Sequence, residues 1–411
     1  MKKAFILSIF FTIASIVISL WFKSLGASLF GKEDLAVFYS VLDLVGLFML
    51  LFIGFRASMT VAYNKGANAA DMLNLFRIII AAVTLIGLVL SFFILRAAGF
   101  GIGFWYLALI FAAFAVYTYF SNQLGMYRLY ADTNAVTVIE PLALIAWFYT
   151  VYYLFGIAGV DALYLAAPLG MLSVAVYVWV RKSRAHPEPA FFAPSFDDRL
   201  KAFLKNSAFG GAEFVFGILI LYLAVLFVGK MISLEALGEF QVVVKSFFMY
   251  FISIFVFPIV KFILPELSYL VERGEFERIK RLNRFAFFYA ALAGLGALTF
   301  SAVFGRPLIS WLFGDSYLPS YVPLIILSTA LFFVALNTYQ VAVLKSLDRF
   351  FLSMSVRATG SVLFVVYAFA VYQFLPTLEG VSLALVFSYA TMALISHYFS
   401  KAEMKKLALK D

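Results

Sequence analysis

The chain has 411 residues, of which 64% are hydrophobic and only 13% are charged, and its mean hydropathy is +1.00. A water-soluble core cannot hold that much apolar surface, so the sequence predicts an all-α integral membrane protein whose solvent is a lipid bilayer. The chain has no cysteine, which excludes a disulfide, a thiolate nucleophile and a Cys-ligated metal site. Its two histidines have no ligand partner at metal spacing, so we expect no metal and no cofactor.

Twelve apolar stretches are each long enough to cross a hydrocarbon core of ~30 Å, which takes ~20 helical residues. In chain order they cover roughly residues 4–30, 35–62, 73–97, 103–125, 134–155, 158–180, 203–229, 235–264, 284–304, 319–344, 350–375 and 380–400. The first stretch is longer than the apolar part of a signal peptide and has no small-residue cleavage site before Gly31. We therefore expect it to be a retained helix.

The basic residues are sorted to one side of these spans. With a cytoplasmic N-terminus, 22 of the 31 lysines and arginines fall on the inner side, four on the outer side and five within spans. The positive-inside rule then predicts that both termini face the cytoplasm. Topology accounts for the net charge of +9, so we expect no nucleic-acid partner.

A polar stretch divides the spans into two groups of six. Residues 181–205 read RKSRAHPEPAFFAPSFDDRLKAFLK, with three prolines and mixed charge, as is typical of a cytoplasmic linker. The sequence predicts an N-terminal six-helix lobe (1–180), this linker, a C-terminal six-helix lobe (206–400) and a cytoplasmic tail (401–411). Because six is even, the lobes are expected to be parallel repeats.

Apart from charged residues assigned to the flanking sides of the spans, such as Arg77 and Arg96, eight charged residues are assigned to the spans themselves, several of them about ten residues from a span end and hence near the midplane. A lone charge at that depth costs ~2.5–3.5 kcal/mol, so such residues are expected to face a wet cavity or each other. The bases are Lys23, Arg56, Lys245, Lys261 and Arg357, and the acids are Asp43, Glu140 and Glu213. Snorkelling to the headgroups or purely structural ion pairing are the alternatives.

The surplus of bases favours an anionic ligand, because guanidinium and ammonium groups bind phosphate oxygens well. Polar residues also recur at helical spacing on the first span, from Ser8 to Lys23, and on the seventh, at Asn206, Gly210, Glu213 and Gly217. Each stripe predicts either a cavity lining or a close helix-packing face.

Four segments resemble the polysaccharide transporter branch of the multidrug/oligosaccharidyl-lipid/polysaccharide exporter superfamily. They read LFGKEDLAVFYSVLDLVGLFMLLFIGFRASMTVAYNKG, PELSYLVERGEFERIKRLNR, LISWLFGDSYLPSYVPLIIL and LKSLDRF. The resemblance implies two six-helix lobes that form a V-shaped central cleft, alternating access, and residence in the bacterial inner membrane among its lipids. It implies a flippase that moves undecaprenyl-pyrophosphate-linked oligosaccharide of the O-antigen type from the cytoplasmic to the periplasmic leaflet.

On this interpretation the five bases are substrate-binding candidates for the pyrophosphate. Glu213 is the first candidate for binding a coupling H⁺ or Na⁺, and Asp43 and Glu140 are the second. The alternative within the superfamily is a cation-coupled multidrug exporter. An enzyme is not expected, because the chain has neither the large periplasmic loop of an O-antigen polymerase nor the acidic metal motifs of a glycosyltransferase.

Overall fold

The structure is a computed structural model that describes residues 2–64, 68–195, 197–257, 263–347 and 349–408. All regular structure in these ranges is helical. Within them, twelve helical stretches are long and apolar enough to cross a membrane, and each overlaps one of the predicted spans. The predicted all-α class with about twelve spans is therefore confirmed, and the chain is a multi-pass membrane protein.

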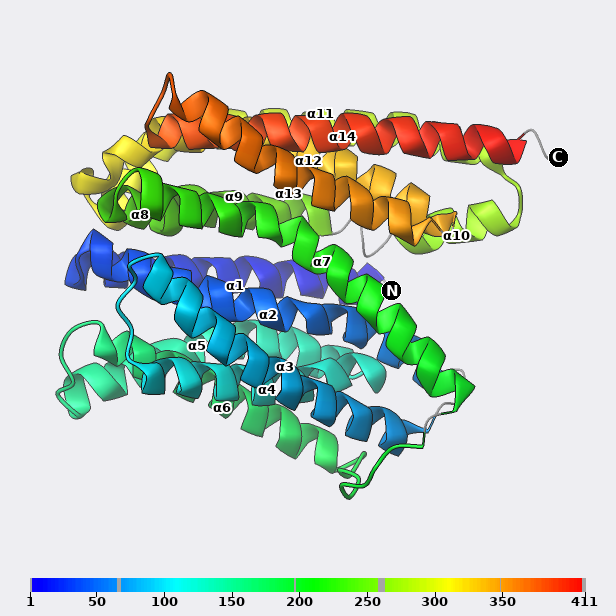
Figure 1. The fold of residues 1–411 in the computed structure, drawn as a ribbon, viewed down its shortest axis with the longest axis horizontal. Coiled ribbons are helices and arrows are strands. Elements are labelled where there is room, and N and C mark those ends of the chain that lie inside the picture. Colours follow the sequence, from blue (N-terminus) through cyan, green and yellow to red (C-terminus); the bar gives the residue numbers. More distant parts are fainter. Residues whose placement is uncertain (1, 65–67, 196, 258–262, 348, 409–411) are drawn as a thin grey trace. The chain divides into compact units, whose positions relative to one another are not determined.

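The chain divides into two compact units, Met1–Val215 and Phe216–Asp411 (Figure 1). The helices of the first unit are α1 (Lys2–Leu29), α2 (Lys32–Asn64), α3 (Ala69–Ala97), α4 (Phe104–Met126), α5 (Tyr130–Tyr149) with the π-helical turn η1 (Thr150–Leu154), α6 (Asp161–Ser183) and the first half of α7 (Asp198–Met231). The boundary between the compact units thus lies inside α7, and the predicted division into two lobes joined by the 181–205 linker stays a prediction.

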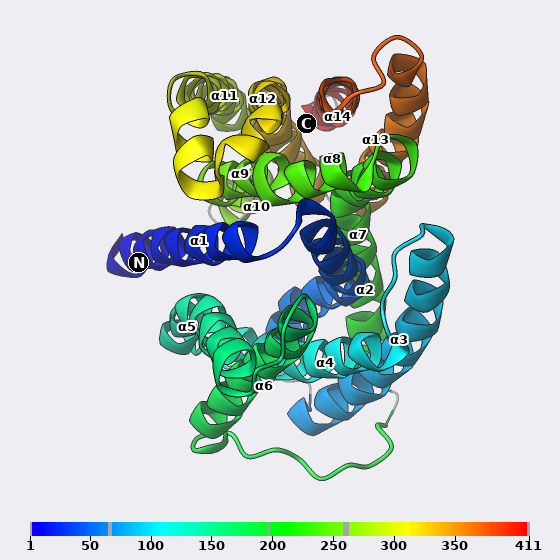
Figure 2. The same cartoon turned by 90° about the vertical axis from the view of Figure 1, so that its left-hand side faces the viewer.

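In the first unit, α4 is the central helix. It packs against α2, α3 and α6, while α5 packs against α6 and α1; Figure 2 shows the same helices from the left-hand side of Figure 1. Fully buried phenylalanines fill the contacts, among them Phe52, Phe76 and Phe111. Phe55 stacks on Phe76 with ring centroids 5.2 Å apart, and such aromatic pairs add to the energy of area burial.

The second unit begins within α7. Its other elements are α8 (Leu234–Glu239), the π-helical turn η2 (Phe240–Val244), α9 (Lys245–Phe251), the π-helical turn η3 (Ile252–Val256), α10 (Leu264–Glu272), α11 (Phe276–Phe313), the 3₁₀ turn η5 (Asp315–Ser320), α12 (Tyr321–Ser346), α13 (Phe350–Tyr372) and α14 (Leu378–Ala408). Here α12 is central and packs against α9, α11 and α14, while α13 packs against α14. The same pattern of neighbours occurs around α4.

Local sequence signals explain several helix ends. Asn68 caps α3, since its side chain accepts a hydrogen bond from the backbone N–H of Ala70 at 3.0 Å. Gly314 ends α11 with a φ of 88°, a conformation that glycine adopts without strain. The helix α11 begins eight residues before the predicted span at 284, because the basic and amphipathic stretch FERIKRLN continues the helix beyond its apolar part.

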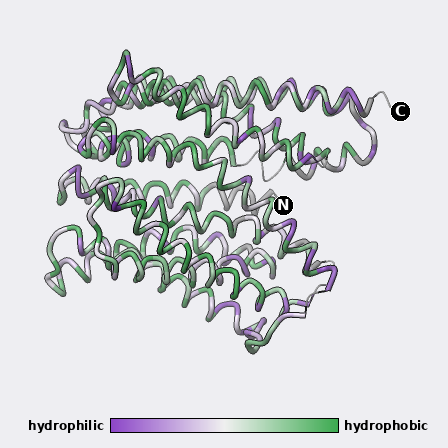
Figure 3. The backbone as a smooth tube through the Cα atoms, viewed as in Figure 1, coloured by the Kyte–Doolittle hydropathy of each residue, from purple (hydrophilic) through white to green (hydrophobic). Residues whose placement is uncertain are grey.

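The distribution of apolar side chains fits a lipid solvent. The most hydrophobic candidate span lies in α3, yet only 22% of its most apolar stretch is buried. Large apolar side chains are exposed along it, including Leu85 and Phe93. In Figure 3, hydrophobic residues run along the helices, and hydrophilic residues gather at helix ends and connections. In water such a surface would drive aggregation, whereas in a bilayer it contacts acyl chains.

The first half of α7 packs closely against α2. A side-chain carbon on Gly54 of α2 would lie 2.6 Å from the carbonyl oxygen of Ser207 and would collide with the backbone of Gly211. The ring of Phe203 also meets that of Phe55 edge-on, with centroids 5.7 Å apart. Small residues at such a crossing let two backbones approach, as is common between helices in lipid.

Candidate functional site

Arg56 lies two turns before the end of α2, and its side chain is exposed. Its Nε donates a hydrogen bond of 3.1 Å to Oδ1 of Asn122 on α4. Asn122 is buried, and its Nδ2 donates to the carbonyl oxygen of Phe52 at 2.8 Å. Within the described part of the chain, the two terminal nitrogens of Arg56 donate no hydrogen bond. They are available to a ligand.

An acid lies near this arginine. Glu140 of α5 accepts a hydrogen bond of 2.8 Å from the hydroxyl of Tyr117 on α4. The charges of Glu140 and Arg56 are close enough to interact electrostatically. The sequence treated Arg56 as a substrate-binding candidate and Glu140 as a coupling candidate. The structure brings the two into one polar cluster, which we call the Arg56 cluster: Arg56, Tyr117, Asn122 and Glu140.

Two further candidates of the first unit share a face of α2. The Nζ of Lys23, on α1, lies 4.0 Å from the ring centroid of Tyr39, which is a cation–π contact. Asp43 follows Tyr39 by four residues and therefore lies one helical turn away on the same face. Lys23 and Asp43 thus belong to the same region, where α1 meets α2.

Glu213 lies on the first half of α7 and is only 4% exposed. Its neighbours Gly210 and Gly211 contact Gly54 and Leu51 of α2. At Gly210, the polar stripe of the seventh span is therefore a helix-packing face, which was one of the two alternatives that the sequence predicted.

In the second unit, Lys245 is the first residue of α9 and follows directly after η2. Its Nζ donates a hydrogen bond of 3.1 Å to Oε1 of Gln241, which is buried. The backbone oxygen of Gln241 accepts from the hydroxyl of Ser246 at 2.8 Å. The turns η2 and η3 lie on either side of α9, and π-helical turns are rare and frequent at functional sites.

Arg357 lies on α13, with its guanidinium packed against Gly217 of α7, where any side chain would collide with it. Tyr389 of α14 is within electrostatic range of Arg357, and its ring centroid lies 5.9 Å from that of Phe248 on α9. The helices that carry Lys245 and Arg357 are therefore linked through Tyr389. Lys261 lies outside the described residues.

The candidates are distributed over both units. The first unit holds Lys23, Asp43, Arg56, Glu140 and Glu213, and the second holds Lys245 and Arg357. A shared role for Glu213 with the two bases of the second unit stays a prediction. Among the described residues, no three acidic or histidine side chains are grouped so that they could hold a metal ion.

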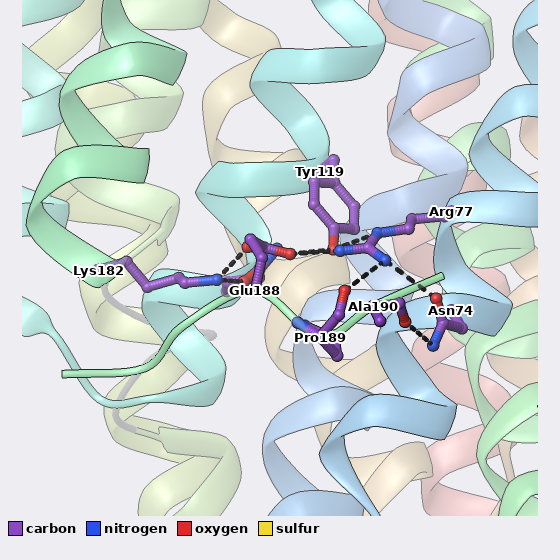
Figure 4. Close-up of polar contacts among 8 residues, drawn as sticks. Asn74, Arg77, Tyr119, Lys182, Glu188, Pro189 and Ala190 are labelled. Atoms are coloured by element: carbon purple, nitrogen blue, oxygen red, sulfur yellow. Dashed lines mark hydrogen bonds and ion pairs between the residues drawn. The ribbon is translucent and has the colours of Figure 1, made fainter. Parts of the chain in front are cut away.

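Sequence reasoning missed a second polar cluster, which Figure 4 shows. Glu188 lies between α6 and α7, and its carboxylate accepts hydrogen bonds from Nη2 of Arg77 at 2.6 Å and from the Tyr119 hydroxyl at 2.7 Å. It also pairs with Nζ of Lys182, a side chain with no exposed surface. Lys182 donates a second bond of 2.7 Å to Oε1 of Gln123. We call these five residues the Glu188 cluster.

The segment that carries Glu188 is fixed along its length. We call residues 184–195 the strap. The carbonyl oxygen of Pro189 accepts a hydrogen bond from Arg77 at 3.0 Å, and that of Ala190 accepts one from the Asn74 side chain at 3.2 Å (Figure 4). Side chains of α3 therefore satisfy the backbone of a segment that has no secondary structure of its own.

Both ends of the strap are also held. The ring of His186 stacks on that of Tyr127, with centroids 3.9 Å apart. The backbone N–H and the hydroxyl of Ser195 donate to the two carboxylate oxygens of Asp71, at 3.1 and 3.3 Å. The strap is thus part of the first unit rather than a loose tether.

The electrostatics of this cluster favour ionised Glu188. Burial acts to raise the pKa of Glu188, but the hydrogen bonds from Lys182, Tyr119 and Arg77 outweigh it and hold the pKa below its ordinary value. One signal could have found the cluster. Glu188 is the only acid in the strap, and it follows a strongly basic helix end within six residues of Lys182.

No protein-family model matches the chain, and no curated protein matches its sequence. Solved structures do match. An inward-facing multidrug resistance MATE family transporter of the MOP superfamily has a TM-score of 0.77 at 15% identity, over 97% of this chain and 95% of that chain. The lipid II flippase MurJ, in an inward closed conformation, has a TM-score of 0.74 at 13% identity, over 100% of this chain and 90% of that chain.

A third structure is a MOP superfamily transporter from Pyrococcus furiosus with a binding pocket of reverse polarity, which suggests a different function for that protein. Its TM-score is 0.72 at 16% identity, over 100% of this chain and 97% of that chain. At these identities the likeness establishes the fold. The chain is therefore a multi-pass membrane protein with the fold of the MOP superfamily transporters.

Proposed function

We propose that the protein is a flippase that moves undecaprenyl-pyrophosphate-linked oligosaccharide from the cytoplasmic to the periplasmic leaflet by alternating access. Intramembrane bases bind the pyrophosphate, with Arg56 as the principal residue and Lys23, Lys245, Lys261 and Arg357 as the others.

Both termini and the 181–205 linker face the cytoplasm in this proposal. Reporter fusions after Asp411 test the orientation: a fusion that is active only in the periplasm contradicts it.

The geometry of Arg56 is the observation that carries the proposal. A guanidinium inside a membrane span is costly unless it serves a ligand or a partner. Arg56 has its Nε fixed by Asn122, and among the described residues its terminal nitrogens have no acceptor. Two parallel N–H groups of that kind match the oxygens of a phosphate group. The likeness between the fold of this chain and that of the lipid II flippase MurJ adds support to the proposal.

The test is flipping of a fluorescent polyprenyl-pyrophosphate-linked oligosaccharide in liposomes, followed by dithionite quenching of the label on the outer leaflet. We expect Arg56→Ala to lower the flipping rate at least about tenfold, and Arg56→Lys to restore little of it, because an ammonium cannot form the bidentate contact. The same label on a neutral polyprenol is the control. Equal flipping of the charged and neutral lipids by the wild-type protein contradicts the proposal.

A cation-coupled multidrug exporter is the second candidate, and the fold likeness to a MATE transporter favours it. Such a protein needs acids to hold a cationic drug, and Glu140 is an acid within the spans. The two candidates differ in their substrate. Uptake of a cationic dye into the same liposomes, with no flipping of the pyrophosphate lipid, supports the exporter.

We further propose that Glu140 binds the coupling proton, ahead of Glu213 and Asp43, because its charge interacts with that of Arg56. When the pyrophosphate leaves, Glu140 compensates the arginine, and its protonation frees the arginine for the next substrate. Glu140→Gln keeps the size of the side chain and removes the titration. We expect its flipping rate to lose the wild-type dependence on an imposed pH gradient; a retained dependence assigns coupling elsewhere.

A further inference from the structure

Asn122 is placed between the backbone of α2 and the side chain of Arg56. It is 1% exposed, and its amide bridges the carbonyl oxygen of Phe52 at 2.8 Å and the Nε of Arg56 at 3.1 Å. Phe52 precedes Arg56 by one helical turn. A carbonyl oxygen can only accept, so the NH₂ of Asn122 must face Phe52 and its oxygen must face Arg56. The backbone thereby fixes the direction of the amide.

The stem of Arg56 is held by the same helix. Gly125 follows Asn122 by three residues on α4, and a side-chain carbon there would lie 3.1 Å from Cγ and 3.5 Å from Cδ of Arg56. The missing side chain at Gly125 leaves the space through which the arginine stem runs. One face of α4 thus fixes both the course of the stem and the rotation of the guanidinium.

This arrangement determines which edge of the guanidinium a ligand can meet. A guanidinium binds two oxygens either at its side edge, through Nε and one terminal nitrogen, or at its end, through both terminal nitrogens. Asn122 occupies Nε, so a ligand can place two oxygens only against the end of the guanidinium. The glutamate of the Arg56 cluster takes its hydrogen bond from Tyr117, and in the described residues it makes none with Arg56.

We infer that Asn122 is a positioning residue that leaves the end of the Arg56 guanidinium, with its two terminal nitrogens, facing the ligand. It thereby selects a ligand that offers two phosphate oxygens in the plane of the guanidinium. The inference rests on the proposed pyrophosphate-binding role of Arg56. The alternative is a purely structural role, in which Asn122 only joins α4 to α2. The two roles differ in whether the effect of Asn122 depends on the arginine.

The experiment uses Asn122→Leu, which nearly keeps the size of the side chain and removes the acceptor. Phe52 is not left without a partner, because its carbonyl oxygen lies in the regular part of α2. Inorganic pyrophosphate is the probe, and its Kd is measured from the concentration dependence of the thermal unfolding midpoint. We expect the variant to raise this Kd about tenfold, the effect of losing one well-oriented charged contact.

A double-mutant cycle separates the two roles. In an Arg56→Lys background there is no Nε to orient, so Asn122→Leu is expected to change the Kd no further. The matched control is Asn337→Leu on α12, another buried asparagine, whose Oδ1 accepts no hydrogen bond from the described residues. We expect its Kd to stay within twofold of the wild-type value.

The outcomes are distinct. If the wild-type protein binds no pyrophosphate and flips no pyrophosphate lipid, the proposed function is wrong. If the wild-type protein binds pyrophosphate and Asn122→Leu binds it equally well, only the inference about Asn122 is wrong. An equal loss of affinity with and without Arg56 overturns it as well, because Asn122 then acts on structure alone.

Discussion

Replacing Glu188 by glutamine should lower the free energy of unfolding by about 3 kcal/mol, the cost of breaking a buried ion pair by removing one partner. Lys182 has no exposed surface, so it loses its counter-ion without gaining water. Arg77 and Tyr119 lose their charged acceptor in the same step. The expected result is a lower thermal unfolding midpoint in detergent at neutral pH.

The pH dependence of the free energy of unfolding provides a second test with the same variant. The folded pKa of Glu188 lies below its ordinary value of about 4.3. Its contribution to stability is therefore complete above about pH 4.3 and is lost as the pH falls through the folded pKa. We expect the difference between the wild-type protein and Glu188→Gln to be constant from pH 5 to 8 and to shrink at lower pH.

The matched control is Glu277→Gln. Glu277 pairs with Lys280 at 2.5 Å, but both side chains are largely exposed, at 79% and 62%. Exposed pairs of this kind contribute little, so we expect the midpoint to stay unchanged. A Glu188→Gln midpoint that is no lower than that of Glu277→Gln contradicts a stabilising role for the Glu188 cluster.

A valine at Gly54 should be the most damaging single change at the crossing of α2 and α7. The new Cβ would lie 2.6 Å from the carbonyl oxygen of Ser207 and 2.7 Å from the carbonyl carbon of Gly210. These are backbone atoms and cannot rotate away, so the helices must separate. We expect a destabilisation of at least about 2 kcal/mol, measured as a lower unfolding midpoint and a smaller monodisperse fraction in size-exclusion chromatography.

Gly46→Val on the same helix is the control for this change. A side-chain carbon at Gly46 meets nothing within 4 Å. Both variants place a β-branched residue in α2, so propensity affects them equally. If Gly46→Val is as unstable as Gly54→Val, close approach of the backbones is not the cause.

The sequence predicted the spans well because their length and apolar character depend on the bilayer and not on which helices become neighbours. It identified Glu140 from its depth in a span, and Arg56 as a base within a span but nearer its end. It could not predict that the two meet, since that depends on how α2, α4 and α5 pack. The role of Asn122 was hidden for the same reason, because one amide in an apolar helix has no pattern.

The Glu188 cluster was missed because charged side chains in a polar segment are expected to be solvated. Lys182 lies in the stretch 181–205, which the sequence predicts to be a cytoplasmic linker, yet its side chain is completely buried. The strap has no apolar periodicity, and the amide, hydroxyl and ammonium groups that hold it come from three separate helices, α3, α4 and α6. Only the folded structure brings such groups together.

The strap also has a consequence for how the protein is made. Every described group that holds it lies between Asp71 and Ser195, so all of them are synthesised before the second unit, which begins at Phe216. N-terminal parts of a chain generally fold first during synthesis. Lys182 can therefore acquire its counter-ion while the later spans are still unmade, and the first unit can complete its polar contacts before the membrane receives the rest of the chain.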